Sequence, residues 1–114
     1  MYDDLFSLSD KPIAITETGF PAEDFSIMGG SLTFESNPAK QDRYITQLLA
    51  QADRRGFVFI INFVLRDYDA LFDKTGGGDN NIAWRDTGLY DEDGHPRPAL
   101  ETWLAALARP YRGD

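Results

Sequence analysis

Two segments of the chain place apolar residues at the spacing of an amphipathic α-helix. The first helix is predicted from Pro38 to about Arg55, with Asn37 as a polar cap and Gly56 as a stop. The second is predicted to begin at Pro98. The apolar faces that indicate these helices consist of Tyr44, Ile45, Leu48, Leu49 and Ala52 in the first, and Leu100, Trp103, Leu104 and Leu107 in the second.

Two other segments have the composition of β-strands. Residues 13–16 are apolar on both faces apart from Thr16, and residues 57–63 are rich in aromatic and β-branched side chains. Long irregular loops are predicted after both strands, at 21–37 and 64–87, whereas short turns follow the helices. The order strand, helix, strand predicts a parallel pair, and the long loops predict a site at the carboxyl ends of the strands.

Two parallel strands do not account for a stable sheet, because each leaves backbone groups unpaired at an edge. A closed eight-stranded barrel needs roughly 250 residues, whereas this chain has 114. We therefore expect the chain either to be the end of a longer protein or to complete its sheet with further copies. The helical spacing of Tyr2, Leu5 and Phe6 suits a short helix or the end of a longer one.

The composition is that of an acidic, folded protein, with 42% hydrophobic and 26% charged residues. The formal net charge of -8 argues against nucleic acid or an anionic membrane surface as a partner, and leaves a neutral or cationic substrate open. The sequence contains no cysteine, which excludes disulfides, thiolate metal sites and thiol nucleophiles. We predict no membrane-spanning segment, because no apolar run approaches about 20 residues, and residues 1–10 do not have the pattern of a secretory signal. The cellular location stays open.

Glu17 is the most informative polar residue. It follows the first predicted strand and precedes Gly19 and Pro21, which favour a turn. A carboxylate at the point where a buried strand emerges is costly unless it is paired or used. Glu17 is therefore either a functional carboxylate at the rim of a sheet or an ion-paired side chain that ends the strand.

Residues 15–21, Ile-Thr-Glu-Thr-Gly-Phe-Pro, resemble the seventh-strand motif of the retaining (β/α)8-barrel glycoside hydrolases. The motif is similar to its form in endo-β-1,3-glucanases and β-galactanases. Residues 88–100 resemble the segment that leads into helix eight of such barrels. The resemblance covers nearly the whole chain, from strand seven to helix eight. It implies an α/β fold in which residues 1–114 are one partial domain, the C-terminal quarter of a TIM barrel.

The same resemblance implies that Glu17 is the nucleophile, because a glutamate at the end of strand seven has this role in the clan. Retaining hydrolysis also needs an acid/base carboxyl group about 5 Å away. The clan carries that group near the end of strand four, which this chain does not supply. The carboxylates of its own loops are expected to be solvated rather than catalytic, namely Glu23, Asp24, Glu35, Asp67 and Asp69.

Three further residues are candidates for substrate binding. Trp84 offers an aromatic face on which a pyranose ring could stack, and Phe20 could line the mouth of the site. Arg66 could orient Glu17 or bond a sugar hydroxyl. The alternatives are a loop anchor for Trp84, packing beneath the loop for Phe20 and an ion pair for Arg66. The single histidine, His95, lies in a predicted turn and is assigned to the surface.

No cofactor or metal ion is expected. The acidic stretches at 73–81 and 91–93 lack the ligand order of an EF-hand, and glycines 76–78 are not followed by the lysine of a phosphate-binding loop. Two functions remain. The chain either carries the nucleophile of a hydrolase that acts on an oligo- or polysaccharide and is inactive alone, or it is a non-catalytic, self-associating α/β module with at most weak carbohydrate binding.

Overall fold

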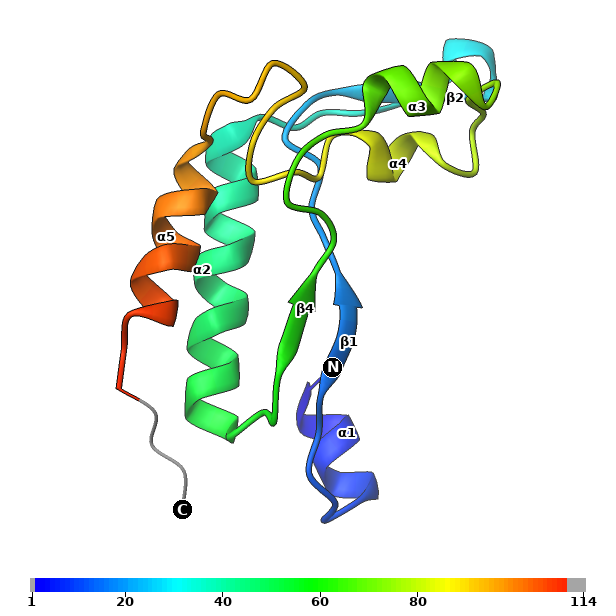
Figure 1. The fold of residues 1–114 in the computed structure, drawn as a ribbon. Coiled ribbons are helices and arrows are strands. Elements are labelled where there is room, and N and C mark those ends of the chain that lie inside the picture. Colours follow the sequence, from blue (N-terminus) through cyan, green and yellow to red (C-terminus); the bar gives the residue numbers. More distant parts are fainter. Residues whose placement is uncertain (1, 111–114) are drawn as a thin grey trace.

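The computed structural model describes residues 2–110 of the chain, which form a mixed α/β structure (Figure 1). Two parallel strands, β1 (Ile15–Thr18) and β4 (Ile60–Asn62), are connected through the long helix α2 (Pro38–Arg55). Helix α1 (Tyr2–Leu8) precedes β1, and helix α5 (Pro98–Leu107) follows the last long loop. The predicted parallel pair and the three predicted helices are confirmed.

The limits of both strands differ from those predicted. Glu17 lies within β1 rather than after the strand, and β4 covers only three of residues 57–63. Ile15 and Thr18 pair with residues that are only two apart in β4, so the register is irregular. Two further hydrogen bonds, from the backbone N–H groups of Val58 (2.8 Å) and Phe63 (2.6 Å), extend the pairing beyond both ends. The apolar runs are therefore extended, but only their centres have regular strand pairing.

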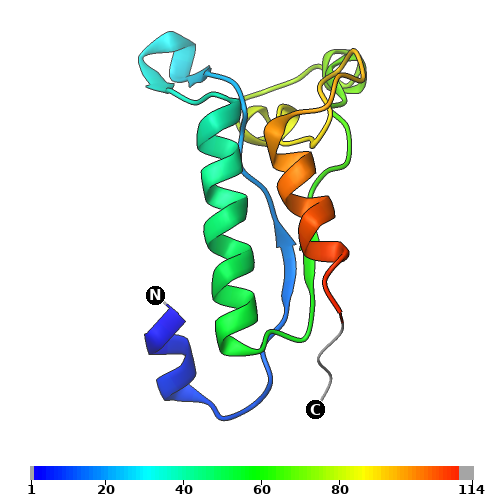
Figure 2. The same ribbon diagram turned by 90° about the vertical axis from the view of Figure 1, so that its left-hand side faces the viewer.

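Helices α2 and α5 lie side by side in one layer against the strands, and both run antiparallel to them (Figures 1 and 2). Their contact forms the core of the molecule. Trp103 is partly buried against this core, as its place on the apolar face of the helix predicts. The buried residues of the core are Ile45, Leu89, Ala99 and Leu100.

Both ends of α2 have the caps that the sequence predicts. The side-chain oxygen of Asn37 accepts a hydrogen bond of 3.0 Å from the backbone N–H of Lys40. At the other end Gly56 adopts a left-handed conformation, with a φ of 65° that side chains other than glycine disfavour. These caps fix the points at which the chain enters α2 from the loop at 21–37 and leaves it toward β4.

The opposite face of the β1–β4 pair, which we call the open face, is not covered by any element within residues 2–110. Ile61 is 52% exposed, although its neighbours Ile60 and Asn62 are partly buried. Phe59 is 47% exposed. Each strand has one hydrogen-bonded neighbour in the described part of the chain, so each also presents a free edge. The structure therefore lacks one of the two layers that usually cover a parallel sheet.

The loop at 21–37 is not irregular, and the prediction of an irregular loop was wrong. It contains a hairpin of β2 (Phe25–Ile27) and β3 (Leu32–Phe34), joined by the short 3-10 helix η1 (Met28–Gly30). The rings that begin β2 and end β3 stack with their centroids 5.2 Å apart. Strands of three residues are too short to show the alternation by which a strand is recognised in a sequence.

The second long loop, 64–87, contains the short helices α3 (Asp69–Lys74) and α4 (Ile82–Arg85). These helices and the β2–β3 hairpin project from the carboxyl ends of β1 and β4 toward the side away from α2 and α5 (Figure 1). A hydrogen bond of 2.8 Å from the Met28 backbone N–H to Asp79 joins the two loops at their tips.

No helix within residues 2–110 is long and apolar enough to cross a membrane.

Candidate functional site

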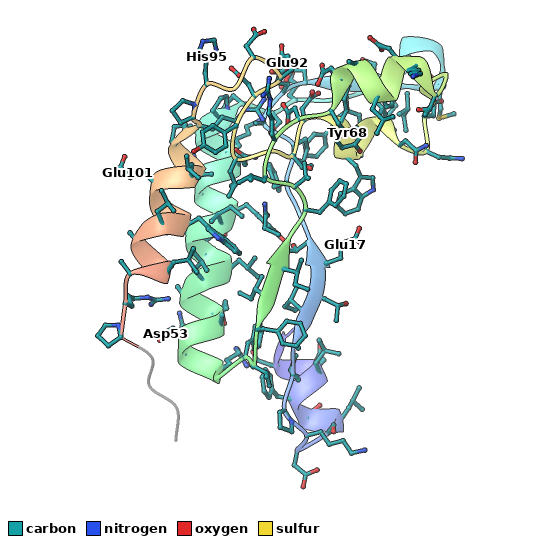
Figure 3. The ribbon with its side chains drawn as sticks, in the orientation of Figure 1. Glu17, Asp53, Tyr68, Glu92, His95 and Glu101 are labelled. Atoms are coloured by element: carbon teal, nitrogen blue, oxygen red, sulfur yellow. The ribbon has the colours of Figure 1, made fainter. Side chains whose placement is uncertain are left out.

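Glu17 and Thr18 point to opposite faces of β1. The hydroxyl group of Thr18 is hydrogen-bonded to that of Tyr44 on α2, so Thr18 faces the helix layer. Glu17 is exposed and projects away from the helices, from the open face of the strand pair (Figure 3). Within residues 2–110 its carboxylate has no hydrogen bond and no ion pair. The structure therefore does not show the ion pair that was the alternative interpretation of this residue.

Gly19 allows the ends of β1 and β4 to approach each other closely. A Cβ atom at this position would overlap the carbonyl oxygen of Phe63 and would lie 3.3 Å from both Thr87 and the ring of Trp84. No side chain can be placed there without moving backbone. The indole ring of Trp84 thus lies against Gly19, which is two residues after Glu17 in the sequence.

Trp84 belongs to a small aromatic group at this end of the strands. Its ring meets that of Phe63 edge to face, with centroids 5.9 Å apart, and Phe63 meets Tyr68 at the same distance. Trp84 remains 36% exposed. Figure 3 shows Tyr68 above Glu17 on the same side of the molecule. The loops therefore place aromatic surface against the turn that follows Glu17.

Phe20 lies on the other side of the strand end. Its ring stacks on that of Tyr44, with centroids 5.1 Å apart, and meets Phe34 edge to face. Together with Lys40 and Arg43 of α2, it lines an open hollow of about 250 Å³. The structure thus places Phe20 against α2, and not beside Glu17 on the open face.

Arg66 is held by the turn before α5. Its guanidinium group donates a hydrogen bond to the carbonyl oxygen of Glu92, and its backbone pairs with Tyr90. In the described part of the chain no contact joins it to Glu17. His95 also lies in this turn and is exposed, with its ring 3.2 Å from the Asp91 carboxylate. The turn is thus a separate polar cluster. It lies at the rim, which we define as the end of the molecule where the loops after β1 and β4 and the turn before α5 come together.

A buried polar network joins the loops at the strand ends, and only one of its residues could be recognised in the sequence. Gln41 is only 1% exposed, and its side-chain amide donates to the carbonyl oxygens of Phe20, Thr87 and Gly88 at 3.2, 3.2 and 2.9 Å. Because Gln41 lies four residues before Ile45, it shares the apolar face of α2. A polar residue on that face was the available signal.

Gly88 is held from both sides. Its backbone N–H donates to Asp67 at 2.7 Å, and its carbonyl oxygen also accepts a 2.9 Å hydrogen bond from Arg97. A Cβ atom on Gly88 would overlap the Asp67 side chain and backbone. The loop after β4 and the start of α5 are therefore both bonded to the backbone of one residue, Gly88.

Asp67 is fully buried, so the expectation that it is a solvated loop carboxylate was wrong. Its side chain is 0% exposed and lies 2.8 Å from the guanidinium group of Arg97, which is also buried. Arg97 further reaches Glu23 at 3.2 Å. These residues come from three distant segments of the chain, and no local pattern in the sequence brings them together.

Five acidic residues meet at this point, and we call them the carboxylate cluster: Glu23, Asp67, Asp69, Asp86 and Glu92. Oxygen atoms of Glu23, Asp67 and Glu92 lie within 4.8 Å of one another, and those of Asp67, Asp69 and Asp86 do likewise. Such spacing could hold a cation, but the guanidinium groups of Arg97 and Arg85 already supply positive charge there. We therefore assign Glu23, Asp67, Asp69 and Asp86 to ion pairs and not to a metal site.

Burial raises the pKa of three carboxyl groups in the cluster, those of Glu23, Asp67 and Asp69, above their ordinary values. The nearby Asp86 carboxylate raises each pKa further. The guanidinium groups oppose this effect, since Arg97 favours the charged form of Asp67 and Arg85 that of Asp69. In these groups the cost of burying the charge exceeds the gain from the ion pairs.

No protein-family model and no curated protein matches this sequence. Among solved structures, a beta-glucuronidase of Faecalibacterium prausnitzii is similar in fold, with a TM-score of 0.67 and 22% sequence identity. The match covers 99% of this chain but only 18% of that enzyme. The chain therefore spans less than a fifth of the length of its structural neighbour.

At this level of identity the likeness shows the fold alone. The neighbour is a glycoside hydrolase, so the comparison agrees with a glycoside hydrolase-like piece of structure. It does not extend to a particular family, such as the glucanases or galactanases, or to particular strands of a barrel. The predicted mixed α/β structure with two parallel strands is nevertheless what the chain adopts.

Proposed function

We propose that residues 1–114 form a partial domain, strand seven to helix eight, of a retaining glycoside hydrolase with a (β/α)8 barrel, and that Glu17 is its nucleophile. The observation that carries this proposal is the position of Glu17 at the carboxyl end of a parallel strand, on the face that no described element covers. The likeness in fold to part of a beta-glucuronidase supports it.

In the proposed reaction, a carboxylate oxygen of Glu17 attacks the anomeric carbon of a β-linked sugar. The bond to the leaving oxygen breaks as an acid/base carboxyl group donates its proton to that oxygen. Water then gives a proton back to the acid/base and displaces Glu17 from the sugar. The acid/base lies outside this chain in our proposal, because Asp67, Asp86 and Glu23 are engaged by arginines.

The proposed substrate is an oligo- or polysaccharide. Trp84 is the candidate stacking surface, because it is partly exposed and lies against the turn that follows Glu17. Phe20 and Arg66 were predicted to contact the sugar as well. Their places against α2 and in the turn before α5 favour support of the loops that surround the site instead.

The first test uses the chain itself with a panel of 4-nitrophenyl β-glycosides that includes the β-glucuronide. We expect no sustained turnover, because the absent carboxyl group is also the base that activates water to release the sugar from Glu17. Turnover that persists in Glu17→Gln would show that another residue is the nucleophile. Turnover that Glu17→Gln abolishes would confirm the nucleophile and overturn the claim that the chain is inactive alone.

The second test supplies the missing strands. The chain replaces the matched segment of the Faecalibacterium beta-glucuronidase, and the chimaera is assayed with 4-nitrophenyl β-glucuronide. We expect activity that Glu17→Gln abolishes and that Glu101→Gln, an exposed carboxylate on α5, preserves. In Glu17→Gly, added azide should restore turnover by entering the space of the carboxylate. A folded, active chimaera that is insensitive to Glu17→Gln would overturn the assignment.

The alternative function, a self-associating module without catalysis, is favoured by the exposed apolar side chains of the open face, Phe59 and Ile61. Light scattering over a range of concentrations separates the two functions. A defined oligomer in which Ile61→Lys releases monomers would favour the module. A monomer would leave the open face for the remaining strands of a barrel.

A further inference from the structure

The carboxylate cluster holds more negative charge than its partners neutralise. Its five acidic side chains face two guanidinium groups, those of Arg97 and Arg85. Two more charged or titratable side chains of the described residues approach the cluster, namely Arg66, which is bound to the Glu92 carbonyl oxygen, and Tyr68. When every carboxyl group is ionised, Asp67 is a fully buried anion with carboxylate neighbours within 4.8 Å on two sides.

The cluster is also the place where the rim loops meet. Glu23 comes from the loop after β1, Asp67 and Asp69 from the loop after β4, and Glu92 from the turn before α5. Asp86 belongs to the segment whose backbone accepts a 2.8 Å hydrogen bond from Ala22. Repulsion among these side chains therefore acts between segments that must stay together for the rim to keep its shape.

We propose that the folded chain holds a proton shared within the carboxylate cluster, so that the joining of the rim loops is strongest on the acid side of neutrality. One proton, shared between Asp67 and a neighbour, removes the contact of two anions at a buried position and leaves each arginine with a partner. The raised pKa values of Glu23, Asp67 and Asp69 agree with this assignment.

The sign of the pH dependence follows from those directions. A carboxyl group whose pKa is higher in the folded than in the unfolded state binds more protons when folded. The chain is then most stable below the unfolded pKa, about 4, and loses stability as the pH rises through the folded pKa. Asp3 and Asp91, whose pKa values hydrogen bonds lower, act in the opposite sense, but only below about pH 4.

The test is urea unfolding of the chain at fixed protein concentration between about pH 4.5 and 8.5, with exchange of the Gly88 amide as a local measure. As the pH increases, we expect the free energy of unfolding to fall. We also expect hydrogen exchange at the Gly88 amide to accelerate by more than its intrinsic pH dependence. Asp67→Asn keeps an oxygen that can accept from Gly88, and it should flatten both profiles. Asp69→Asn, at a partly exposed position, gives a second variant if Asp67→Asn does not fold. Glu101→Gln should retain the wild-type profile.

Two outcomes of the pH series would overturn the proposal. One is a wild-type stability that is constant or rises with pH over this range. The other is an unchanged slope in both Asp67→Asn and Asp69→Asn. Repeating the series in His95→Gln removes the single histidine as a source of pH dependence. If calcium chloride abolishes the slope by stabilising the chain near pH 8, the cluster is a cation site and not a proton site. None of these measurements depends on glycosidase activity, so their failure is distinct from failure of the proposed function.

Discussion

The two faces of the β1–β4 pair differ in completeness. The face toward α2, which we call the covered side, packs against helices of the chain. Thr18 is hydrogen-bonded to Tyr44, and Ile45 is buried in the core between the helices. On the open face, Ile61 is exposed and Glu17 has no partner in the described part of the chain. The comparison shows that helices of this chain cover one face of the strand pair, whereas no element within residues 2–110 covers the face that carries Glu17.

The largest effect is expected where the loops at the strand ends meet, at Arg97. In Arg97→Met the buried Asp67 carboxylate loses its ion pair, which should lower the free energy of unfolding by about 3–5 kcal/mol. Urea unfolding at about pH 7 measures this. Arg109→Met is the matched control, because that arginine is half-exposed and lies 3.8 Å from Asp53, and it should cost about 0–1 kcal/mol. Equal costs would show that the Asp67–Arg97 pair does not hold the rim.

A pair of isoleucines tests the two faces directly. Ile45→Ala should cost about 2–5 kcal/mol, because it leaves a cavity in the core. Ile61→Ala should cost below about 1 kcal/mol in a monomer, since about half of the residue's surface is exposed to water. Thermal or urea unfolding of both variants checks this. A large cost at Ile61 would mean that a second copy covers the open face, and the cost should then depend on protein concentration.

The covered side was largely predictable from the sequence, and the loops of the rim were not. Helix α2 has 18 residues, so its period and both of its caps are visible in the sequence. The β2–β3 hairpin has strands of three residues, which are too short to show a period. Asp67, Arg97 and Gln41 form a site only through the meeting of distant segments. Local pattern singled out Glu17 as a candidate, but it could not show which carboxylates are buried.

Gly19 connects the two faces, and its substitution should have an intermediate effect. In Gly19→Ala the new Cβ atom must displace the Phe63 carbonyl oxygen or the strand end. We expect a loss of about 1–3 kcal/mol, as for other overpacked sites, together with a change in Trp84 fluorescence. Gly56→Ala is the control. It has a positive φ but open space around it, so the indole signal should not change. An unchanged indole signal in Gly19→Ala would argue against a close approach of Trp84 to the turn after Glu17.

The smallest effect on stability is expected at Glu17, and this result decides between its two interpretations. The carboxylate is exposed and makes no hydrogen bond or ion pair within residues 2–110, so Glu17→Gln should change the free energy of unfolding by no more than about 0.5 kcal/mol. In the beta-glucuronidase chimaera the same substitution should lower turnover by about 10⁴-fold or more, as expected for loss of a nucleophile. A residue that is neutral for folding and essential for turnover is a catalytic residue. A clear loss of stability on urea unfolding, with turnover unchanged, would instead make Glu17 the ion-paired end of a strand.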